Sequence, residues 1–385
     1  MSRSDFPLPA TDSIAPAHPR SADIRSTYAF VLDAERAALS YVEGGSLTNA
    51  TTNAYTANVV SLVCARIVGY LIIEPLNETA RAHVLNEVKS CHAKYGDSQE
   101  ELYDSIYTLG THYLNHFIRP FKKYKGRTPT PSGHVSCPSF DRKQEFIKAN
   151  LVSTPTSHSQ LKINALIRDG YRCMVTGKFD SDSLSKITEL AIEFRSYQSA
   201  RKDYGTTNCC HIIPASTNMN LVDDKAEDVA SVWTVLSNFG EPNLVNELRG
   251  ANTHRLENIL TLDYTPHNWF DQLNMWFDKV DPLDQNDHRY FVRLAEAIGS
   301  FVYPEFPKEI EFVNHAPDFI TLPLPDYRYL RIHAACAKIA HLSGASEYID
   351  QVFQDIERMP ALANDGSSAD VLSNALICLA DVETY

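Results

Sequence analysis

The spacing of apolar residues changes near one third of the way along the chain. From Ser26 to about Phe121 apolar residues recur three and four positions apart, the period of a helix that buries one face. The stretch KGRTPTPSGHVSCPS (125–139) is then rich in proline, glycine, serine and threonine, which is typical of a linker or an exposed loop. The sequence therefore predicts an all-α N-terminal region over residues 23–124 and a linker over 125–140.

Beyond residue 140, short β-prone and helical segments alternate. The expected strands are YRCMV (171–175), CCHIIP (209–214), NILTLD (258–263), LNMWFDKV (273–280), HRYFVRLA (288–295) and EIEFVN (309–314). A helix is expected over 226–240, and the last segment predicts two helices broken at Ser343-Gly344. The pattern predicts an α+β domain with helical insertions over residues 141–325, followed by a C-terminal helical extension over 326–385.

The N-terminal residues and the cysteines bear on the compartment. Residues 1–22 are rich in proline, serine and alanine without a continuous apolar run, which predicts a disordered leader and no signal peptide. The most apolar stretch, Val59 to Ile73, is shorter than the roughly 20 residues that a bilayer requires and contains Arg66, so no membrane span is expected. Eight cysteines without a CxxC pair suggest reduced thiols. The expected location is intracellular, nuclear or cytoplasmic, and not secreted.

The charge is unevenly distributed. The chain has a net charge of −13, from 35 basic and 48 acidic residues, which argues against a general nucleic-acid binder. Between Asn115 and Val175, however, eleven lysines and arginines face three acidic residues, so this window carries +8 and the rest of the chain −21. One positive face on an acidic protein is therefore expected.

Four side chains form a pattern that suits metal chemistry. His211 ends a short apolar strand just before a proline, and Asn258 begins the next expected strand. His267 and Asp271 stand four apart in an expected helix, so they share one face and can bind one cation. Histidine, asparagine and histidine on strand, strand and helix are the elements of a ββα-metal site. Taken singly, each has an ordinary interpretation as a core histidine, a turn residue or a solvated charge, and Cys210 as a small buried residue.

Three blocks together resemble the HNH endonuclease family, in the form common in fungi. They are RDGYRCMVTG (168–177), CCHIIPAS (209–216) and HRLENILTLDYTPHNWFDQL (254–273). The resemblance covers about 165 to 358 and implies a ββα-metal nuclease domain. By resemblance, His211 matches the general base, Asn258 the asparagine that fixes the loop and the base, and His267 a metal ligand. Asp271 falls where related nucleases place another ligand.

The sequence departs from the family in two places. Many HNH sites have aspartate or histidine as a metal ligand immediately before the base, whereas this chain has Cys210, a soft ligand that favours Zn²⁺ if it binds. His211 and Asn258 are also 47 positions apart, which a helical insertion carrying Trp233 explains because a long loop costs little extra entropy. The expected cofactor is a divalent metal ion, with Mg²⁺ or Mn²⁺ favoured and Zn²⁺ second.

The resemblance implies a divalent-metal-dependent endonuclease that hydrolyses phosphodiester bonds of nucleic acid, with DNA preferred to RNA. The residues expected to contact nucleic acid are Arg119, Lys122, Lys123, Lys125, Arg127, Arg168 and Arg172. For the segment RPFKKYKGR (119–127), a solvated helix end is the alternative. For the whole domain, the alternative function is a catalytically inactive HNH-fold module that binds nucleic acid or protein.

Overall fold

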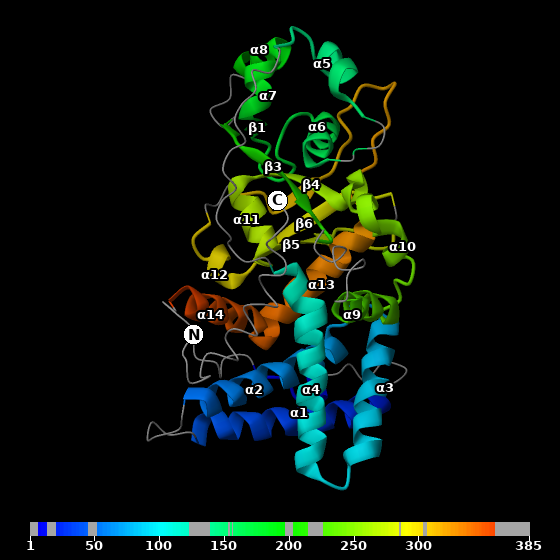
Figure 1. Ribbon diagram of the computed structural model, residues 1–385, viewed down its shortest axis with the longest axis vertical. Coiled ribbons are helices and arrows are strands. Elements are labelled where there is room, and N and C mark those ends of the chain that lie inside the picture. Colours follow the sequence, from blue (N-terminus) through cyan, green and yellow to red (C-terminus); the bar gives the residue numbers. More distant parts are fainter. Residues whose placement is uncertain are drawn as a thin grey trace. The chain divides into compact units, whose positions relative to one another are not determined.

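The computed structural model describes residues 7–13, 21–44, 52–122, 139–152, 155, 157–196, 203–214, 226–284, 286–302 and 306–358. The chain divides into two compact units, shown with their elements in Figure 1. The helical unit comprises Met1–Tyr124, Asn220–Val245 and Ala335–Thr384. The mixed unit comprises Lys125–Met219, Asn246–Ala334 and Tyr385.

The helical unit contains the helices that the N-terminal pattern predicts. They are α1 (Ser21–Gly44), α2 (Thr52–Ile73), α3 (Glu78–Tyr95) and α4 (Gln99–Tyr113), with α9 (Ala226–Asn238) and α14 (Ala345–Arg358) from later in the chain. Asn77 and Ser98 begin α3 and α4 as N-caps, their side chains accepting backbone hydrogen bonds from Ala80 and Glu101. Helix α4 continues as a π-helical turn, Leu114–Ile118, and a short 3-10 turn, Arg119–Phe121.

A buried ion pair joins α1 and α2. Arg66 Nε donates to Glu35 Oε1 at 2.7 Å, and both side chains are almost fully buried. Glu35 also accepts from the backbone N–H of Leu8 at 3.0 Å. Leu8 is itself buried, although it falls in the stretch predicted as a leader. The buried side chain of Leu8 and the hydrogen bond from its backbone N–H to Glu35 therefore hold residues 7–13 against α1. Residues 1–6 and 14–20 lie outside the described residues.

Helix α9 packs against the N-terminal helices. The ring of Phe239, which follows α9, is stacked on Tyr113 with centroids 5.7 Å apart and edge-on to Phe117 at 5.2 Å. Asn77 Nδ2 donates to the Phe239 carbonyl at 2.7 Å. The helix expected as an insertion in the mixed domain thus belongs to the helical unit, which differs from the continuous domain predicted for residues 141–325.

The mixed unit combines short helices with small sheets. Its helices are α5 (Lys143–Asn150), α6 (His158–Arg168), α7 (Ser181–Lys186), α8 (Thr188–Ser196), α11 (Tyr264–Asp271) and α12 (Glu296–Gly299). Its strands are β1 (Phe179–Asp180), β2 (Tyr204–Gly205), β3 (Thr207–His211), β4 (Ile259–Asp263), β5 (Met275–Lys279), β6 (Arg289–Leu294) and β7 (Glu309–Glu311). Helices α10 (Leu244–Leu248) and α13 (Tyr327–Ser343) have residues in both units. This composition agrees with the predicted α+β class.

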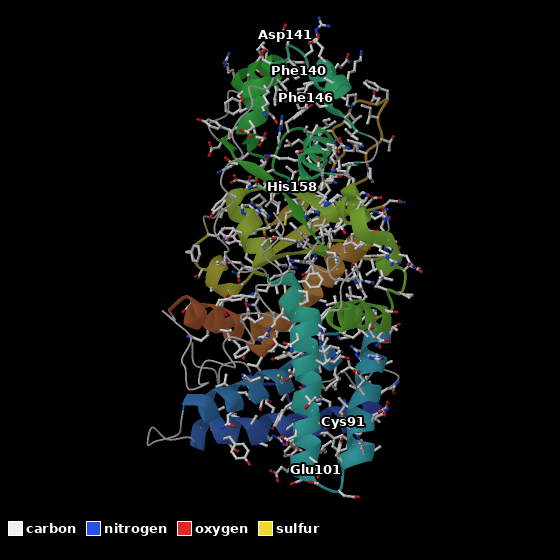
Figure 2. All side chains as sticks on the ribbon, in the orientation of Figure 1. Cys91, Glu101, Phe140, Asp141, Phe146 and His158 are labelled. Atoms are coloured by element: carbon white, nitrogen blue, oxygen red, sulfur yellow. The ribbon has the colours of Figure 1, made fainter. Side chains whose placement is uncertain are left out.

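Hydrogen bonds in the mixed unit form three sheets. Strands β5, β6 and β7 are antiparallel neighbours in that order, which confirms the predicted hairpin and the strand after it. Strands β3 and β4 form a second antiparallel pair, and β1 and β2 a short parallel pair. A core cluster that includes Phe146, Ile167, Tyr171 and Phe179 is formed by side chains of α5, α6, α8 and β1 and of the segments next to them. Phe140 meets Phe146 edge-on at its outer end (Figure 2).

The β-prone run over 171–175 is not a strand, and that prediction was wrong. Tyr171 has a φ of 60°, and its backbone N–H donates to the Leu166 carbonyl at 2.7 Å, which closes the end of α6. Arg172 makes only an isolated bridge to Phe179. Closure of the helix end outweighs the β-propensity of the side chains. The break at Ser343-Gly344 is confirmed, because α13 ends at Ser343 and Gly344 takes a φ of 76°.

Within the described ranges, none of the helices combines the length and apolar character needed to cross a membrane. The stretch from Val59 to Ile73 is the second part of α2 and is mostly buried among the other helices of its unit. Its apolar character is therefore explained by burial inside protein.

Candidate metal and catalytic site

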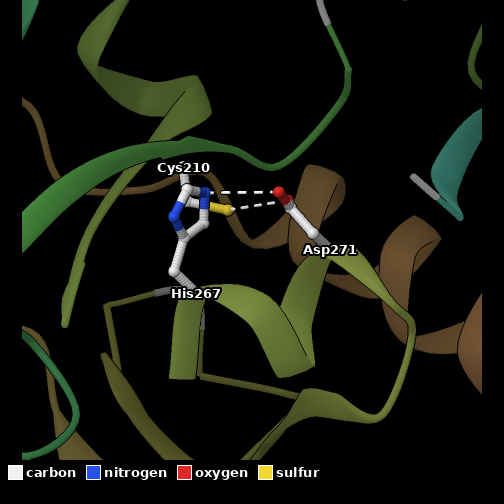
Figure 3. Close-up of side chains that lie close together, drawn as sticks. All are labelled: Cys210, His267 and Asp271. Atoms are coloured by element: carbon white, nitrogen blue, oxygen red, sulfur yellow. Dashed lines mark hydrogen bonds and ion pairs between the residues drawn. The ribbon is translucent and has the colours of Figure 1, made fainter. Parts of the chain in front are cut away.

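Three side chains from two elements, Cys210 on β3 and His267 and Asp271 on α11, point toward one another in the mixed unit (Figure 3). Cys210 Sγ lies 3.4 Å from Asp271 Oδ1, and His267 Nε2 lies 3.3 Å from Asp271 Oδ2. One potential ligand atom from each residue lies within 4.8 Å of the other two. Cys210 is buried, whereas His267 and Asp271 are each about one-fifth exposed, so the cluster is reachable from solvent on the helix side. Among the described residues, this is the one group of three such ligands.

The local sequence explains why these side chains meet. Strands β3 and β4 pair with Cys210 opposite Leu260 and His211 opposite Ile259. Helix α11 starts directly after β4, with Pro266 in its first turn where a missing N–H costs nothing. Because His267 and Asp271 are four residues apart, both project from one face of α11. The two strands and the helix thus place the three donors together.

Asn258 joins segments on both sides of the site. Its side chain is fully buried, and Oδ1 accepts from the Ile213 N–H at 2.8 Å. Nδ2 donates to the Ile213 carbonyl at 2.9 Å and to the Thr253 carbonyl at 3.1 Å. The Asn258 carbonyl also accepts from Ile212, one residue after His211. One amide side chain therefore fixes the chain that follows His211.

Replacing Asn258 by alanine is expected to destabilise the protein by about 2–4 kcal/mol, because it leaves the buried Ile213 N–H and two carbonyls without these partners. Urea unfolding followed by circular dichroism measures the loss. Asn252, exposed in the same loop, is the matched control, and its alanine variant should stay within about 0.5 kcal/mol of the wild type. Equal effects at both positions would contradict the bracing role of Asn258.

Two histidines that the sequence pattern did not single out lie beside His211, which is itself buried. His254 Nδ1 is 3.1 Å from His211 Nε2, and the ring of His158 has its centroid 6.4 Å from that of His211. Burial lowers the pKa of His254. Burial first, and then the charges of His254, Lys162 and His267, lower the pKa of His158 at the start of α6 (Figure 2). Neutral imidazoles therefore surround His211 near pH 7.

The sequence offered one signal for His254 and none for His158. His254 opens the same run, HRLENILTLDYTPHNWFD, that supplies Asn258, His267 and Asp271. It lies 43 positions after His211, so only the pairing of β3 with β4 brings the two rings together. His158 comes from α6, a segment before the three blocks that carry the resemblance.

The basic residues expected to contact nucleic acid divide into two groups. Arg119 and Lys122 are buried in the helical unit. Lys122 Nζ donates to Ser346 Oγ at 2.7 Å and to Asp350 Oδ2 at 3.0 Å, and burial lowers the pKa of its ammonium group. The burial of both side chains fits neither the predicted phosphate contact nor the solvated helix end, and for Lys122 internal acceptors replace water. Lys123, Lys125 and Arg127 lie outside the described residues.

Arg168 is fully buried and does not face a substrate, which corrects its predicted phosphate contact. Its guanidinium binds both oxygens of Asp169, at 2.6 and 2.9 Å. It also donates to the carbonyls of Leu256 at 2.7 Å and Ile259 at 2.9 Å, which flank Asn258. Arg172 is partly exposed but binds Glu193 at 2.7 Å and lies over the Phe179 ring. Arg168 thus holds the backbone on both sides of Asn258 in place.

Replacing Arg168 by lysine is expected to cost about 3–5 kcal/mol, because one ammonium group cannot satisfy Asp169 and two carbonyls that a planar guanidinium reaches together. Urea unfolding measures this cost. Arg172→Lys is the matched control, since its pair with Glu193 is partly exposed and should contribute about 1 kcal/mol or less. A small loss for Arg168→Lys would mean that the buried network is not specific for arginine.

Part of the chain matches a known family. Residues 173–278 match the family model described as HNH endonuclease, which confirms the resemblance found in the three blocks. The matched range contains Cys210, His211, Asn258, His267 and Asp271. Comparisons with curated proteins and with solved structures give no match. The family suggests a nuclease-type function and a nucleic-acid substrate.

Proposed function

We propose that this protein is a divalent-metal-dependent HNH endonuclease that hydrolyses phosphodiester bonds of nucleic acid, with DNA as the preferred substrate. The observation that carries the proposal is the convergence of three metal-ligand types, Cys210, His267 and Asp271, beside a buried histidine, His211. These residues come from β3 and α11, and β4 pairs with β3 and leads directly into α11. The arrangement has the order of a ββα-metal site.

The donor set fits a divalent ion of intermediate softness. Tetrahedral zinc sites have bonds of about 2.3 Å to sulfur and about 2.0–2.2 Å to nitrogen and oxygen, so neighbouring ligands lie roughly 3.3–3.6 Å apart. Cys210 Sγ lies 3.4 Å from Asp271 Oδ1 and His267 Nε2 lies 3.3 Å from the other oxygen, Oδ2, and one ligand atom from each of the three residues lies within 4.8 Å of the others, so the donors are close enough to share one ion. A thiolate suits Zn²⁺ better than Mg²⁺ or Mn²⁺. We therefore place Zn²⁺ ahead of the two ions that the sequence alone favoured.

Each residue then has a defined task. His211 takes the proton of the attacking water as general base, a step that typically contributes about 10²–10⁴-fold. Asn258 holds the backbone after His211 and so keeps the imidazole in place. Cys210, His267 and Asp271 would hold the metal ion. A divalent ion held there would neutralise charge on the scissile phosphate and stabilise the leaving oxygen.

Contact with the substrate is assigned to those basic residues between 115 and 175 that are not known to be buried. Lys123, Lys125 and Arg127 remain candidates from the sequence, because they stand in a segment with an excess of positive charge. Arg172 is a weaker candidate, since Glu193 already pairs with it. The preference for DNA over RNA is part of the proposal and rests on the family resemblance.

The second candidate function is an interaction module that kept the HNH fold and lost cleavage. Cys210 favours it, because this buried thiol stands where many HNH sites have a hard ligand. The presence of His211, Asn258 and His267 favours the enzyme.

Nicking of supercoiled plasmid by the full-length chain separates the two functions. Conversion to open circles with Zn²⁺, Mn²⁺ or Mg²⁺, abolished by EDTA, is expected for the enzyme. RNA of matched sequence, assayed in parallel, tests the substrate preference. Binding of nucleic acid without cleavage under any of these metals would favour the interaction module.

A further inference from the structure

A pair of imidazoles connects His211 to a residue that the HNH pattern leaves without a task. His211 Nε2 and His254 Nδ1 are 3.1 Å apart, and the two rings are tilted by 59°. His211 is buried and His254 half-buried. At this distance one of the two nitrogens carries a hydrogen that the other accepts. The contact therefore decides where the proton of His211 sits.

The two rings are held on segments that are tied together. The hydroxyl of Thr253, the residue before His254, shares its one hydrogen between the Leu248 carbonyl, at 2.8 Å, and the Gly250 carbonyl, at 2.9 Å. The Thr253 carbonyl accepts from Asn258 Nδ2, the same nitrogen that donates to the Ile213 carbonyl beyond His211. The buried side-chain amide of Asn258 thus fixes the backbone next to both histidines relative to each other. The contact between the rings is a built feature of the site.

The protonation state of His254 limits which of the two nitrogens can donate the hydrogen bond between the rings. Burial lowers the pKa of His254, so near pH 7 the ring is neutral, with one N–H and one lone-pair nitrogen. If His254 Nδ1 donates, His211 carries its own proton on Nδ1, and its basic nitrogen, Nε2, is occupied by this hydrogen bond. If His254 Nδ1 accepts, His211 carries its proton on Nε2 and keeps a lone pair on Nδ1. Only the second arrangement suits a base.

We propose that His254 is a positioning residue that accepts a hydrogen bond from Nε2–H of His211 and so holds His211 in the tautomer whose Nδ1 is basic. The inference rests on the proposed function for the role of His211 as a base. The contact itself does not depend on cleavage and can be measured separately. A partner that orients a catalytic base and sets its tautomer is a general requirement of such sites.

Nitrogen-15 NMR of the histidine side chains tests the tautomer in the full-length protein. The His211 signals are assigned by their loss in His211→Ala. The expected result is an Nε2–H tautomer for His211 in the wild type at neutral pH. His254→Ala should shift His211 toward a mixture of tautomers, while His254→Asn should preserve Nε2–H, because the asparagine oxygen can take the place of the Nδ1 lone pair. His254→Gln places its amide where Nε2 stood and is the matched control that should not preserve it.

Cleavage kinetics give the second measurement. His254→Ala is expected to lower kcat by about 10–100-fold, the scale typical of partners that orient a functional histidine. KM should stay within about twofold, because the substrate gains no contact from His254. His254→Asn should recover most of kcat, and His254→Gln should not.

The outcomes separate this inference from the proposed function. An Nδ1–H tautomer in the wild type, or a His211 tautomer that His254→Ala leaves unchanged, overturns the inference. If His254→Ala fails to fold, the wild-type tautomer and the asparagine variant still decide it. If the tautomer responds as expected while the wild type cuts no nucleic acid with any metal, the positioning contact stands and the nuclease proposal fails.

Discussion

Replacing His211 by alanine is expected to lower nucleic-acid cleavage by about 10²–10⁴-fold, because the metal ion cannot substitute for a positioned base. Metal affinity should change little, since Cys210, His267 and Asp271 remain and Asn258 still fixes the neighbouring backbone. Plasmid nicking measures the first quantity and titration calorimetry the second. The variant must be compared with wild type at saturating metal, so that a small change in affinity does not lower the rate.

A second histidine provides the control for purification and for general effects of the substitution. His288 lies in the mixed unit, is partly buried and belongs to neither the ligand cluster nor the group of histidines around His211, and its alanine variant should cleave within about twofold of wild type. Wild-type-like nicking by pure, folded His211→Ala would remove His211 from the role of base. A loss of metal binding in the same variant would assign His211 to the metal site instead.

Local sequence patterns predicted the elements of this fold better than their packing. The period of apolar residues and the glycine at 344 were sufficient for the helices at both ends, because these signals depend on neighbours along the chain. The packing of α9 was not predictable, since its partners Tyr113 and Phe117 are more than a hundred positions away. The position of Leu8 was equally unpredictable, because its backbone N–H donates to a carboxylate on α1, 27 positions away.

The candidate site shows the same division between near and distant partners. His267 and Asp271 could be paired from the sequence because four positions on a helix place them on one face. The contact of His211 with His254 requires the register of β3 and β4, which no spacing rule supplies. Arg168 illustrates a different limit. Its place in the first block of the resemblance suggested a phosphate contact, but its guanidinium binds the carbonyls of Leu256, in a 3-10 turn, and Ile259, at the start of β4, which lie 88 and 91 positions later in the chain.

Cobalt spectroscopy of the Cys210, His267 and Asp271 cluster is expected to show a thiolate-bound metal. Co²⁺ bound through sulfur gives an intense near-ultraviolet charge-transfer band, which oxygen and nitrogen ligands alone do not give. The band should appear in the wild type and vanish in Cys210→Ser, while Co²⁺ still binds more weakly through His267 and Asp271. The measurement needs no substrate, so it tests the metal site whether or not the protein cleaves nucleic acid.

The double variant His267→Ala, Asp271→Ala is expected to lose metal affinity by at least about 100-fold, because even partners one shell further from a metal contribute about 10–100-fold. Calorimetry with Zn²⁺ measures this loss. Cleavage should disappear with it, whatever residue occupies position 210. Cys210→Asp provides the reverse change, since a hard oxygen ligand in place of sulfur should raise cleavage supported by Mg²⁺.

The outcomes distinguish three states of the site. A missing charge-transfer band with unchanged Co²⁺ affinity in Cys210→Ser would make Cys210 a small buried residue beside a two-ligand site. Weak metal binding by the natural chain together with cleavage gained in Cys210→Asp would identify an HNH fold whose activity was lost through this one ligand. Binding of no divalent ion, with a double variant that changes neither stability nor nucleic-acid affinity, would end the enzyme proposal, because the ion pair between His267 and Asp271 would then be an ordinary helix contact of i and i+4 residues.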